Sequence, residues 1–254
     1  MVLEVSSPLP QTCCSSVWLW PGQALYAGPS LNLTPHSGSV WCLAVGVDRP
    51  LTVLFRGGTT YDARVVLIPP RLTHQLICHG GRLVSCYLEP TSDRAQSCRQ
   101  SFNRWIYDDI GVHHAKEEQL LFAPDDDQSA GRWLDLAAPA AERAIDPRIA
   151  FATRRIRADP AMKLSARELS VEAGLSESRF LHLFRNEVGT SLRRYRLWVR
   201  LVAAGTAIST GKNLTTAAVD AGFASPSHLA DRFKATFGLS VTQLLGTGAI
   251  VRTP

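Results

Sequence analysis

The chain has 254 residues, of which 45% are hydrophobic and 19% charged, and its formal net charge is +5 at pH 7. This length and composition predict one or two globular domains with apolar cores. No apolar run approaches the roughly 20 residues that a membrane-spanning helix needs, and Glu4, Pro8 and Pro10 are atypical of a secretory signal. We therefore expect a cytoplasmic protein with no membrane partner.

Charge is divided unevenly along the chain. Residues 146–254 contain 16 Lys and Arg against 8 Asp and Glu, a net charge of +8. Residues 1–145 contain the other 11 basic and 14 acidic residues, a net charge of −3. This asymmetry favours a basic, nucleic-acid-binding module joined to a module of another kind.

The first half of the chain has the pattern of short strands. Residues 41–47 form a continuous apolar run, and alternating patterns cover 51–56 and 61–67. Turn signals follow at Gly57-Gly58, Pro69-Pro70 and Gly80-Gly81, at a spacing of about ten residues. The pattern predicts a small antiparallel barrel or sandwich with strands to about residue 90.

A helical region follows the predicted strands. Residues 97–107 and 129–136 have helical patterns, and the Ala-rich run 137–141 predicts a linker. The expected fold is a multi-domain α+β protein with an N-terminal antiparallel β-barrel, flanking helices and a C-terminal all-α domain. We place the first domain at 1–136, with strands to about 90 and helices over 92–136. The linker then covers 137–145, and the helical domain covers 146–254.

The helical half contains one motif twice, about 48 residues apart. The first copy runs through Gly174 to Phe180 and Phe184, and the second runs through Gly222 to Leu229 and Phe233. Each copy has the pattern of a helix, a turn containing Gly, and a second amphipathic helix, which is the pattern of a helix-turn-helix. A long helix over about 191–209 joins the two copies. The turn-to-Phe spacing is ten residues in the first copy and eleven in the second.

The doubled motif, its spacing and the joining helix resemble the DNA-binding domain of AraC/XylS-type transcription regulators over residues 145–245. The first half resembles, more loosely, the cupin-like sensor domains that are often fused to this module. The residues that carry this second resemblance are Leu25-Tyr26-Ala27-Gly28-Pro29, His36, and Val66-Leu67-Ile68-Pro69-Pro70 with His74. The resemblance implies a sensor and dimerisation domain followed by two recognition helices.

The resemblance also places the residues that read bases in the major groove. They fall on Ser178, Leu181 and His182 in the first recognition helix and on Ser227, Asp231 and Arg232 in the second. Arg179, Arg185 and His228 share these outward faces and complete the predicted DNA-binding set. The family often has Arg where this chain has His182 and Asp231. His182 can donate to a guanine edge, whereas Asp231 would accept from cytosine N4 or orient Arg232.

Three arginines of the joining helix have a different expected role. Arg193, Arg196 and Arg200 form a stripe about 60° wide on one helix face. We expect this stripe to be solvated or to make contacts within the domain, with phosphate contact as the alternative.

The predicted barrel has few of the side chains that metal binding or catalysis requires. Metal-binding cupins need His and carboxylate ligands together, and no Glu lies between Glu4 and Glu89. We therefore expect no metal, no cofactor and no catalytic residues. We expect the barrel instead to contain a pocket that binds a small molecule. Its expected lining is His36, Trp41, His74, Cys78 and Cys86.

The cysteines suit buried, reduced thiols more than a zinc site or a disulfide framework. All six lie in the first half and none forms a CxxC pair; they are Cys13, Cys14, Cys42, Cys78, Cys86 and Cys98. A three-residue loop at 79–81 would turn Cys78 and Cys86 to the same face. A two-residue loop would send them to opposite faces. Inert burial, redox sensing and contact with a ligand therefore all stay open.

These patterns predict a sequence-specific DNA-binding transcription regulator whose barrel senses a small-molecule effector, and not an enzyme. The expected partners are double-stranded DNA, contacted in two successive major-groove turns, an unknown effector, a second copy in a homodimer, and RNA polymerase if the protein activates. One alternative is a constitutive DNA-binding regulator with a vestigial barrel. The other, from a different class, is a cupin enzyme with a helical docking module.

Overall fold

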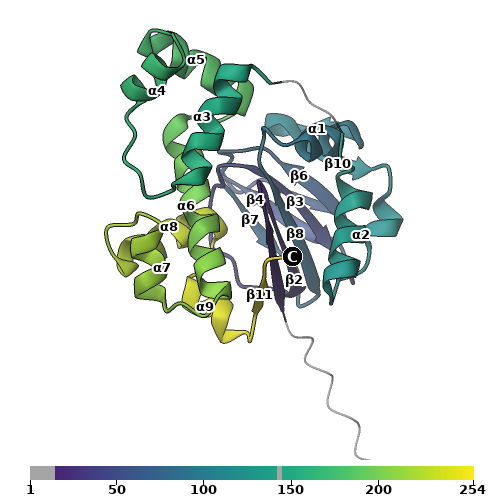
Figure 1. Ribbon diagram of the computed structural model, residues 1–254. Coiled ribbons are helices and arrows are strands. Elements are labelled where there is room, and N and C mark those ends of the chain that lie inside the picture. Colours follow the sequence, from purple (N-terminus) through teal and green to yellow (C-terminus); the bar gives the residue numbers. More distant parts are fainter. Residues whose placement is uncertain (1–14, 142–144) are drawn as a thin grey trace, which may run out of the picture.

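The structure is a computed structural model that describes residues 15–141 and 145–254 (Figure 1). Its larger sheet has eight strands in the order β11-β1-β2-β8-β3-β6-β10-β9. All neighbours pair antiparallel except β11, which runs parallel to β1. The strands are β1 (Ser16–Trp20), β2 (Gln23–Pro29), β3 (Trp41–Gly46), β6 (Val65–Ile68), β8 (Arg82–Leu88), β9 (Phe102–Ile106), β10 (Ile110–His114) and β11 (Ile250–Arg252).

A smaller sheet closes the barrel on one side. It has the order β5-β4-β7, with β4 at Leu51–Phe55, β5 at Thr60–Ala63 and β7 at His74–Ile77. A bridge between His36 and His74 ties the loop after β2 to β7. The tight turn after β7 has His79 at φ 49° and Gly80 at φ 77°. The Gly81 N–H donates to the Cys78 carbonyl at 2.9 Å, which closes a β-turn with these two central residues between a strand of each sheet.

The larger sheet is buried on both faces, which explains why its strands read as continuous apolar runs. One face packs against α1 (Asp93–Gln100) and α2 (Asp127–Ala137), where Trp18 and Trp133 are fully buried. The other face forms the barrel interior with the small sheet, around Leu51 and Ile68. Two separate cores therefore lie on the two sides of one sheet.

The region after β8 differs from the helix predicted over 97–107. The helix α1 ends at Gln100, and β9 follows at once, antiparallel to β10. Ser101 caps α1, and the aromatic and β-branched residues Phe102, Trp105 and Ile106 favour a strand beyond it. The helix predicted over 97–107 is therefore wrong beyond Gln100, where β9 and then β10 replace it. The prediction of helices within 92–136 holds for α2 and for the short 3₁₀ helices at Tyr107–Asp109 and Glu117–Leu120.

Seven helices occupy the described residues from 147 to 246. They are α3 (Pro147–Ala158), α4 (Ala166–Glu172), α5 (Glu177–Val188), α6 (Leu192–Ser209), α7 (Leu214–Asp220), α8 (Pro226–Phe237) and α9 (Val241–Gly246). Figure 1 shows α4 and α5 towards one end of α6 and α7 and α8 towards the other. A β-rich half followed by a helical half confirms the predicted fold class.

The chain returns to the first sheet after α9. Strand β11 pairs with β1 in the register Ser16 to Ile250, which places the last residues of the chain against its first strand. Within the predicted linker 137–145, Ala137 ends α2 and residues 142–144 lie outside the described residues, as do Cys13 and Cys14. No helix in the described part of the chain has the length and hydropathy needed to cross a bilayer.

Candidate nucleic-acid interface and ligand pocket

The two helix-turn-helix units have the same local structure. Ala173 and Ala221 are the C-cap residues of α4 and α7, and the next residues, Gly174 and Gly222, have φ angles of 65° and 81°. Glycine adopts this left-handed conformation without the steric cost that a side chain adds. The turns then lead to Ser176 and Ser225, which cap α5 and α8.

The extra residue of the second unit lies in its turn. Phe184 and Phe233 each come eight residues after the capping serine, so the two recognition helices keep the same register. The distance from Gly to the capping serine is two residues in the first unit and three in the second. The longer spacing predicted from the sequence therefore changes the turn and leaves the helix faces alike.

Buried aromatic residues hold the recognition helices in place. Phe180 and Phe184 on α5 are fully buried, and the Phe184 ring lies 5.6 Å from that of Tyr195 on α6. On α8, Leu229 is buried and the Phe233 and Phe237 rings lie 4.6 Å apart. Burial of one stripe of each helix directs the opposite stripe outward.

The predicted base-reading residues lie on these outward faces. Ser178, Arg179, Leu181, His182 and Arg185 are exposed on α5. On α8, Ser227, Asp231 and Arg232 are exposed and His228 is partly buried. The structure thus places each residue of the predicted DNA-binding set where a ligand can reach it.

Local contacts hold two of these side chains. The His182 ring nitrogen Nδ1 lies 3.3 Å from the Asn186 side-chain amide, one helical turn away. The Arg232 Nε–H points to Nε2 of His228 at 3.3 Å. His228 also packs edge-on against Phe223, with ring centroids 5.6 Å apart. His228 is therefore better placed to orient Arg232 than to read a base.

A basic groove of about 860 Å³ lies between the recognition helices. Leu181 of α5 and Arg232 of α8 line its two sides, and α6 supplies Arg193, Arg194, Arg196 and Arg200. Ser37 and Ser39 of the barrel also line it. The groove concentrates positive charge beside the two faces that carry the predicted readers.

Three of these arginines have structural partners, and Arg194 donates to the Gly38 carbonyl of the barrel at 3.4 Å. Arg196 donates to the Met162 carbonyl at 3.0 Å, and Arg200 donates to the Pro160 carbonyl at 3.0 Å. Both bonds tie α6 to the loop between α3 and α4. Arg193 is exposed on the same helix. The arginine stripe is thus divided between internal contacts and an exposed group.

The barrel contacts the second unit through the loop after β2. The Thr34 N–H donates to the Gly238 carbonyl at 2.8 Å, and the Ser37 N–H donates to the Ala235 carbonyl at 3.2 Å. These carbonyls belong to the C-terminal end of α8, where helix carbonyls have no partner within the helix. The barrel therefore caps a recognition helix, and we call residues 34–38 the capping loop.

A second contact between the halves centres on Glu89, directly after β8. Its side chain is 1% exposed, and Oε1 accepts from the Tyr195 hydroxyl of α6 at 2.8 Å. Thr91 donates to the same oxygen, and Arg157 of α3 lies 3.4 Å from it. The sequence does not predict this role, because a lone Glu before Pro90 has no distinguishing pattern.

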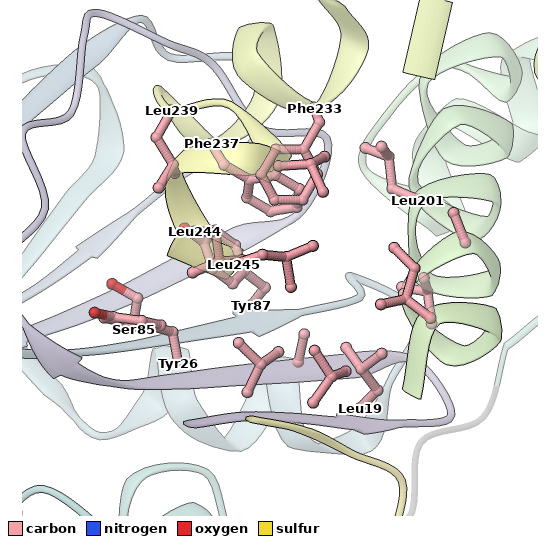
Figure 2. Close-up of a pocket in the computed structure, with 18 of the residues that line it drawn as sticks. Leu19, Tyr26, Ser85, Tyr87, Leu201, Phe233, Phe237, Leu239, Leu244 and Leu245 are labelled. Carbon is pink, nitrogen blue, oxygen red and sulfur yellow. The ribbon is translucent and has the colours of Figure 1, made fainter. Parts of the chain in front are cut away.

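An apolar pocket lies at the seam between the two halves (Figure 2). Strands β1, β2 and β8 supply Leu19, Tyr26, Ser85 and Tyr87 from the inner face of the barrel. The helical half closes the pocket with Leu201 and Gly205 of α6, residues of α8 and α9, and Val251 of β11. Figure 2 shows Leu201 and Ser85 on opposite sides of this space. Its volume is about 110 Å³.

The five residues predicted to line an effector pocket are not brought together. Trp41 and Cys86 lie in the core beneath α1 and α2, whereas Cys78 lies in the barrel interior. Cys78 follows β7 of the small sheet and Cys86 lies in β8 of the larger sheet, so the two thiols belong to different cores. None of the five lines the pocket at the seam.

His36 and His74 form a buried pair. Their ring centroids are 4.4 Å apart, and each Nδ1 lies within hydrogen-bonding distance of a backbone carbonyl, of Thr34 and Leu72 respectively. Burial lowers the pKa of both rings, and that of His74 falls to about 3, with a further contribution from His36. Among the described residues, no group of three or more His, Cys, Asp or Glu is arranged to hold a metal ion.

Four cysteines lie within the described part of the chain, and all four are buried: Cys42, Cys78, Cys86 and Cys98. Burial raises the pKa of Cys42 to about 12 and that of Cys78 to about 11. These groups are thiols at neutral pH, and thiols react more slowly than thiolates. The geometry therefore favours inert packing over redox sensing at these positions.

Comparisons with known proteins address both halves. Residues 169–246 match the family model of a helix-turn-helix domain. No curated protein sequence matches the chain. The structure is similar to an apo form of a ToxT single-site variant from Vibrio cholerae strain SCE256, with a TM-score of 0.59 and 11% identity, covering 89% of this chain and 97% of that one.

Two further ToxT structures have ligands. One, from Vibrio cholerae O395, is bound to (E)-4-(8-methylnaphthalen-1-yl)but-3-enoic acid; its TM-score is 0.55 at 11% identity, covering 89% of this chain and 99% of that one. The other is wild-type ToxT from strain SCE256 bound to an unsaturated fatty acid, with a TM-score of 0.52 at 11% identity and coverage of 89% and 94%. At these identities the similarity shows a shared fold across both halves.

Proposed function

We propose that the C-terminal part of this chain, which matches a helix-turn-helix family model over residues 169–246, is an AraC-type DNA-binding domain, and that the protein is a transcription regulator that reads specific DNA sequences with α5 and α8. The observation that carries this proposal is the duplicated geometry of the two units. Both recognition helices have the same caps, the same register and an exposed polar stripe, and the rigid helix α6 joins them. Such a domain can insert its two helices into successive major grooves, roughly 34 Å apart.

The division of roles follows from the position of each side chain. His182 and Arg232 extend from the recognition helices and would contact base edges, where such contacts set sequence preference. Arg193 in the basic groove would contact phosphate, which raises affinity without reading sequence. Asp231 would not approach a phosphate favourably, so its place is near a cytosine amino group or the Arg232 side chain.

We further propose that the pocket at the seam is the effector site. It joins strands of the barrel to α6, α8 and α9, so a ligand there would touch both halves. ToxT, which shares the fold, is described bound to (E)-4-(8-methylnaphthalen-1-yl)but-3-enoic acid and to an unsaturated fatty acid. A regulator needs an effector whose binding free energy depends on how the DNA-reading helices are held.

The contacts across the seam suggest how coupling would occur. Phe233 and Phe237 line the pocket from α8, and the capping loop binds the C-terminal end of the same helix. A ligand that moves these rings would alter how α8 is presented while α5 keeps its own core. A coupling free energy of about 1–3 kcal/mol is sufficient for regulation of this kind.

The remaining assignments belong to the same proposal. The sensor domain would comprise residues 1–136 and the DNA-binding domain residues 146–254, with β11 returning to the sensor. The protein would act in the cytoplasm as a homodimer, and would contact RNA polymerase if it activates transcription. The pocket, rather than a reactive centre, would give the barrel its role.

Selection of bound sequences from random duplex DNA, at two salt concentrations, tests the proposal. We expect an asymmetric motif with two blocks about one helical turn apart, and an affinity that falls steeply as salt rises. Binding that depends on salt but shows no preferred sequence would contradict specific reading. A motif with one block would show that α8 does not read bases.

A further inference from the structure

We propose that the pocket at the seam takes a small, neutral, mainly hydrocarbon ligand with one hydrogen-bonding group, and that it discriminates against carboxylates and ammonium ions. This inference rests on the proposed effector role of the pocket and specifies the chemical class that the site accepts. It is carried by the lining of the pocket, by one unsatisfied hydroxyl and by the pocket volume.

The lining contains no group that could neutralise a charged ligand. Aliphatic and aromatic side chains from both halves form it, and among the described lining residues Tyr26, Ser85 and Tyr87 are the ones with a hydroxyl. No Lys, Arg, His, Asp or Glu is among them. A carboxylate or an ammonium ion here would lose its hydration and gain no counter-charge.

The strand pattern explains why this lining is so apolar. Alternate residues of β2 and β8 face the two cores of the sheet, and Tyr26, Leu83 and Tyr87 belong to the face shared with the barrel interior. On an ordinary two-layer sheet this face would be fully covered. Here α6, α8 and α9 cover the margin of this face of the sheet. The apolar surface of the sheet therefore forms one wall of the pocket.

Ser85 provides a directional group. Its side chain is 2% exposed, and its hydroxyl oxygen Oγ makes no hydrogen bond. Tyr87, on the same strand, interacts with Ser85 at a geometry that falls short of a hydrogen bond. The Tyr26 hydroxyl donates to the Pro29 carbonyl at 2.7 Å. A buried hydroxyl without a partner is costly, and a ligand hydroxyl or carbonyl group would satisfy it.

The volume sets the size of the ligand. The space measures about 110 Å³, whereas an engineered apolar cavity of roughly 150 Å³ in another protein stays dry and binds benzene. We therefore expect a ligand of about one aromatic ring with at most a short substituent. The carboxylic acids described with ToxT have the wrong charge for this lining.

Four probes of nearly the same shape test the charge class on the full chain. They are ethylbenzene, 2-phenylethanol, phenylacetate and 2-phenylethylammonium, titrated by calorimetry at pH 7. We expect 2-phenylethanol to bind most tightly and ethylbenzene to bind detectably. The two ions should bind about 100-fold more weakly than 2-phenylethanol, because neither finds a counter-charge.

Variants then test the role of the hydroxyl. Ser85→Ala should weaken 2-phenylethanol binding about 5–10-fold, to near the affinity of ethylbenzene, and leave ethylbenzene unchanged. The matched control is Ser209→Ala at the end of α6, whose hydroxyl donates to the Thr206 carbonyl outside the pocket. Ala204→Leu, which places extra carbon atoms in the pocket, should weaken both neutral probes. Circular dichroism and DNA binding report whether each variant folds.

The outcomes separate this inference from the proposed function. Binding of phenylacetate or 2-phenylethylammonium that equals or exceeds that of 2-phenylethanol overturns the inference, while ligand binding at the seam survives. Equal loss of both neutral probes in Ser85→Ala removes the role of the hydroxyl. If none of the four probes binds a chain that still selects a DNA sequence, the inference and the effector role both fail, and DNA reading stands.

Discussion

The hydroxyl of Tyr195 donates to the buried carboxylate of Glu89 at 2.8 Å, across the seam between the barrel and the helical half. Glu89 follows β8, and Tyr195 lies in α6, between the two units that carry the recognition helices. Thr91 and Arg157 complete the set of groups around the same oxygen. The pair therefore fixes α6, and with it both helix-turn-helix units, relative to the barrel.

We expect Tyr195→Phe to weaken this connection without opening a cavity. It removes one hydrogen bond to a charged group, which should lower the free energy of unfolding by about 1.5–3 kcal/mol. Urea denaturation of the variant and of the wild type measures the difference. Tyr107→Phe, at a side chain that is 72% exposed, is the control and should change little. Equal stability of wild type and Tyr195→Phe would mean that Glu89 is satisfied without Tyr195.

The buried pair of His36 and His74 should make stability depend on pH. The unfolded chain binds protons at His74 with a pKa near 6.5, whereas in the folded protein this pKa is about 3. Stability is therefore fully present above pH 6.5 and is lost as pH falls, because the unfolded state takes up the proton first. At pH 5 the loss from His74 alone is roughly 2 kcal/mol.

Urea denaturation at pH 7.5 and pH 5 tests this linkage. The wild type should lose stability between the two values, and His74→Gln should lose less. His113→Gln serves as the control, since His113 is exposed on β10. A pH dependence that is the same in His74→Gln and in the wild type would contradict the assignment of the buried proton site.

Two glycines with the same backbone role allow a matched test of the capping loop. Gly189 and Gly238 end α5 and α8 in the left-handed conformation, with φ angles of 70° and 80°. An added Cβ at Gly189 would lie 3.4 Å from Pro90, an ordinary contact. At Gly238 it would lie 2.6 Å from both His36 Nδ1 and the Thr34 carbonyl oxygen.

Gly189→Ala should therefore cost about 1–2 kcal/mol of stability from backbone strain alone. Gly238→Ala should cost more, because the capping loop must move away from the end of α8. Thermal denaturation of both variants gives the comparison, and limited proteolysis of the loop reports its release. Equal destabilisation by the two substitutions would show that the capping loop can move away from α8 without a loss of folding free energy.

The helical half was predictable because its signals are local. Asp146, Ser165 and Glu168 cap helices as their sequence context indicates, and the turn glycines Gly174 and Gly222 have the expected positive φ angles. Such features depend on neighbours a few residues away, so a single sequence contains them. The exposed faces of α5 and α8 follow from the same periodicity, which is why the predicted readers lie at the surface.

The pocket was not predictable in the same way. The central strands are apolar on both faces, so alternation could not assign Trp41 and Cys86 to one core and Cys78 to the other. The roles of Glu89 and Ser85 depend on helices more than 100 residues away in the sequence. No local pattern encodes a seam between two halves of a chain.

The readers proposed on α5 and α8 give a direct test of sequence preference. His182→Ala should relax base preference in the first block of the selected motif, and Arg232→Ala should do so in the second, each by about 1–3 kcal/mol for the affected base pair. Competition between matched and substituted duplexes measures this at fixed salt. A loss of affinity that is equal for all sequences would assign these side chains to phosphate instead.

The arginines of α6 should separate affinity from stability. Arg193→Ala removes an exposed positive charge from the basic groove, so DNA binding should weaken for every sequence and the slope of log affinity against log salt should fall by about 1. Arg200→Ala removes the hydrogen bond to the Pro160 carbonyl and should lower the free energy of unfolding by about 1 kcal/mol. Filter binding over a salt series and urea denaturation, applied to both variants, give the two readouts. The opposite result, an unchanged salt slope in Arg193→Ala and a lower one in Arg200→Ala, would assign the phosphate contact to Arg200. The side of α6 that faces the DNA would then be the one to which we assign contacts within the protein.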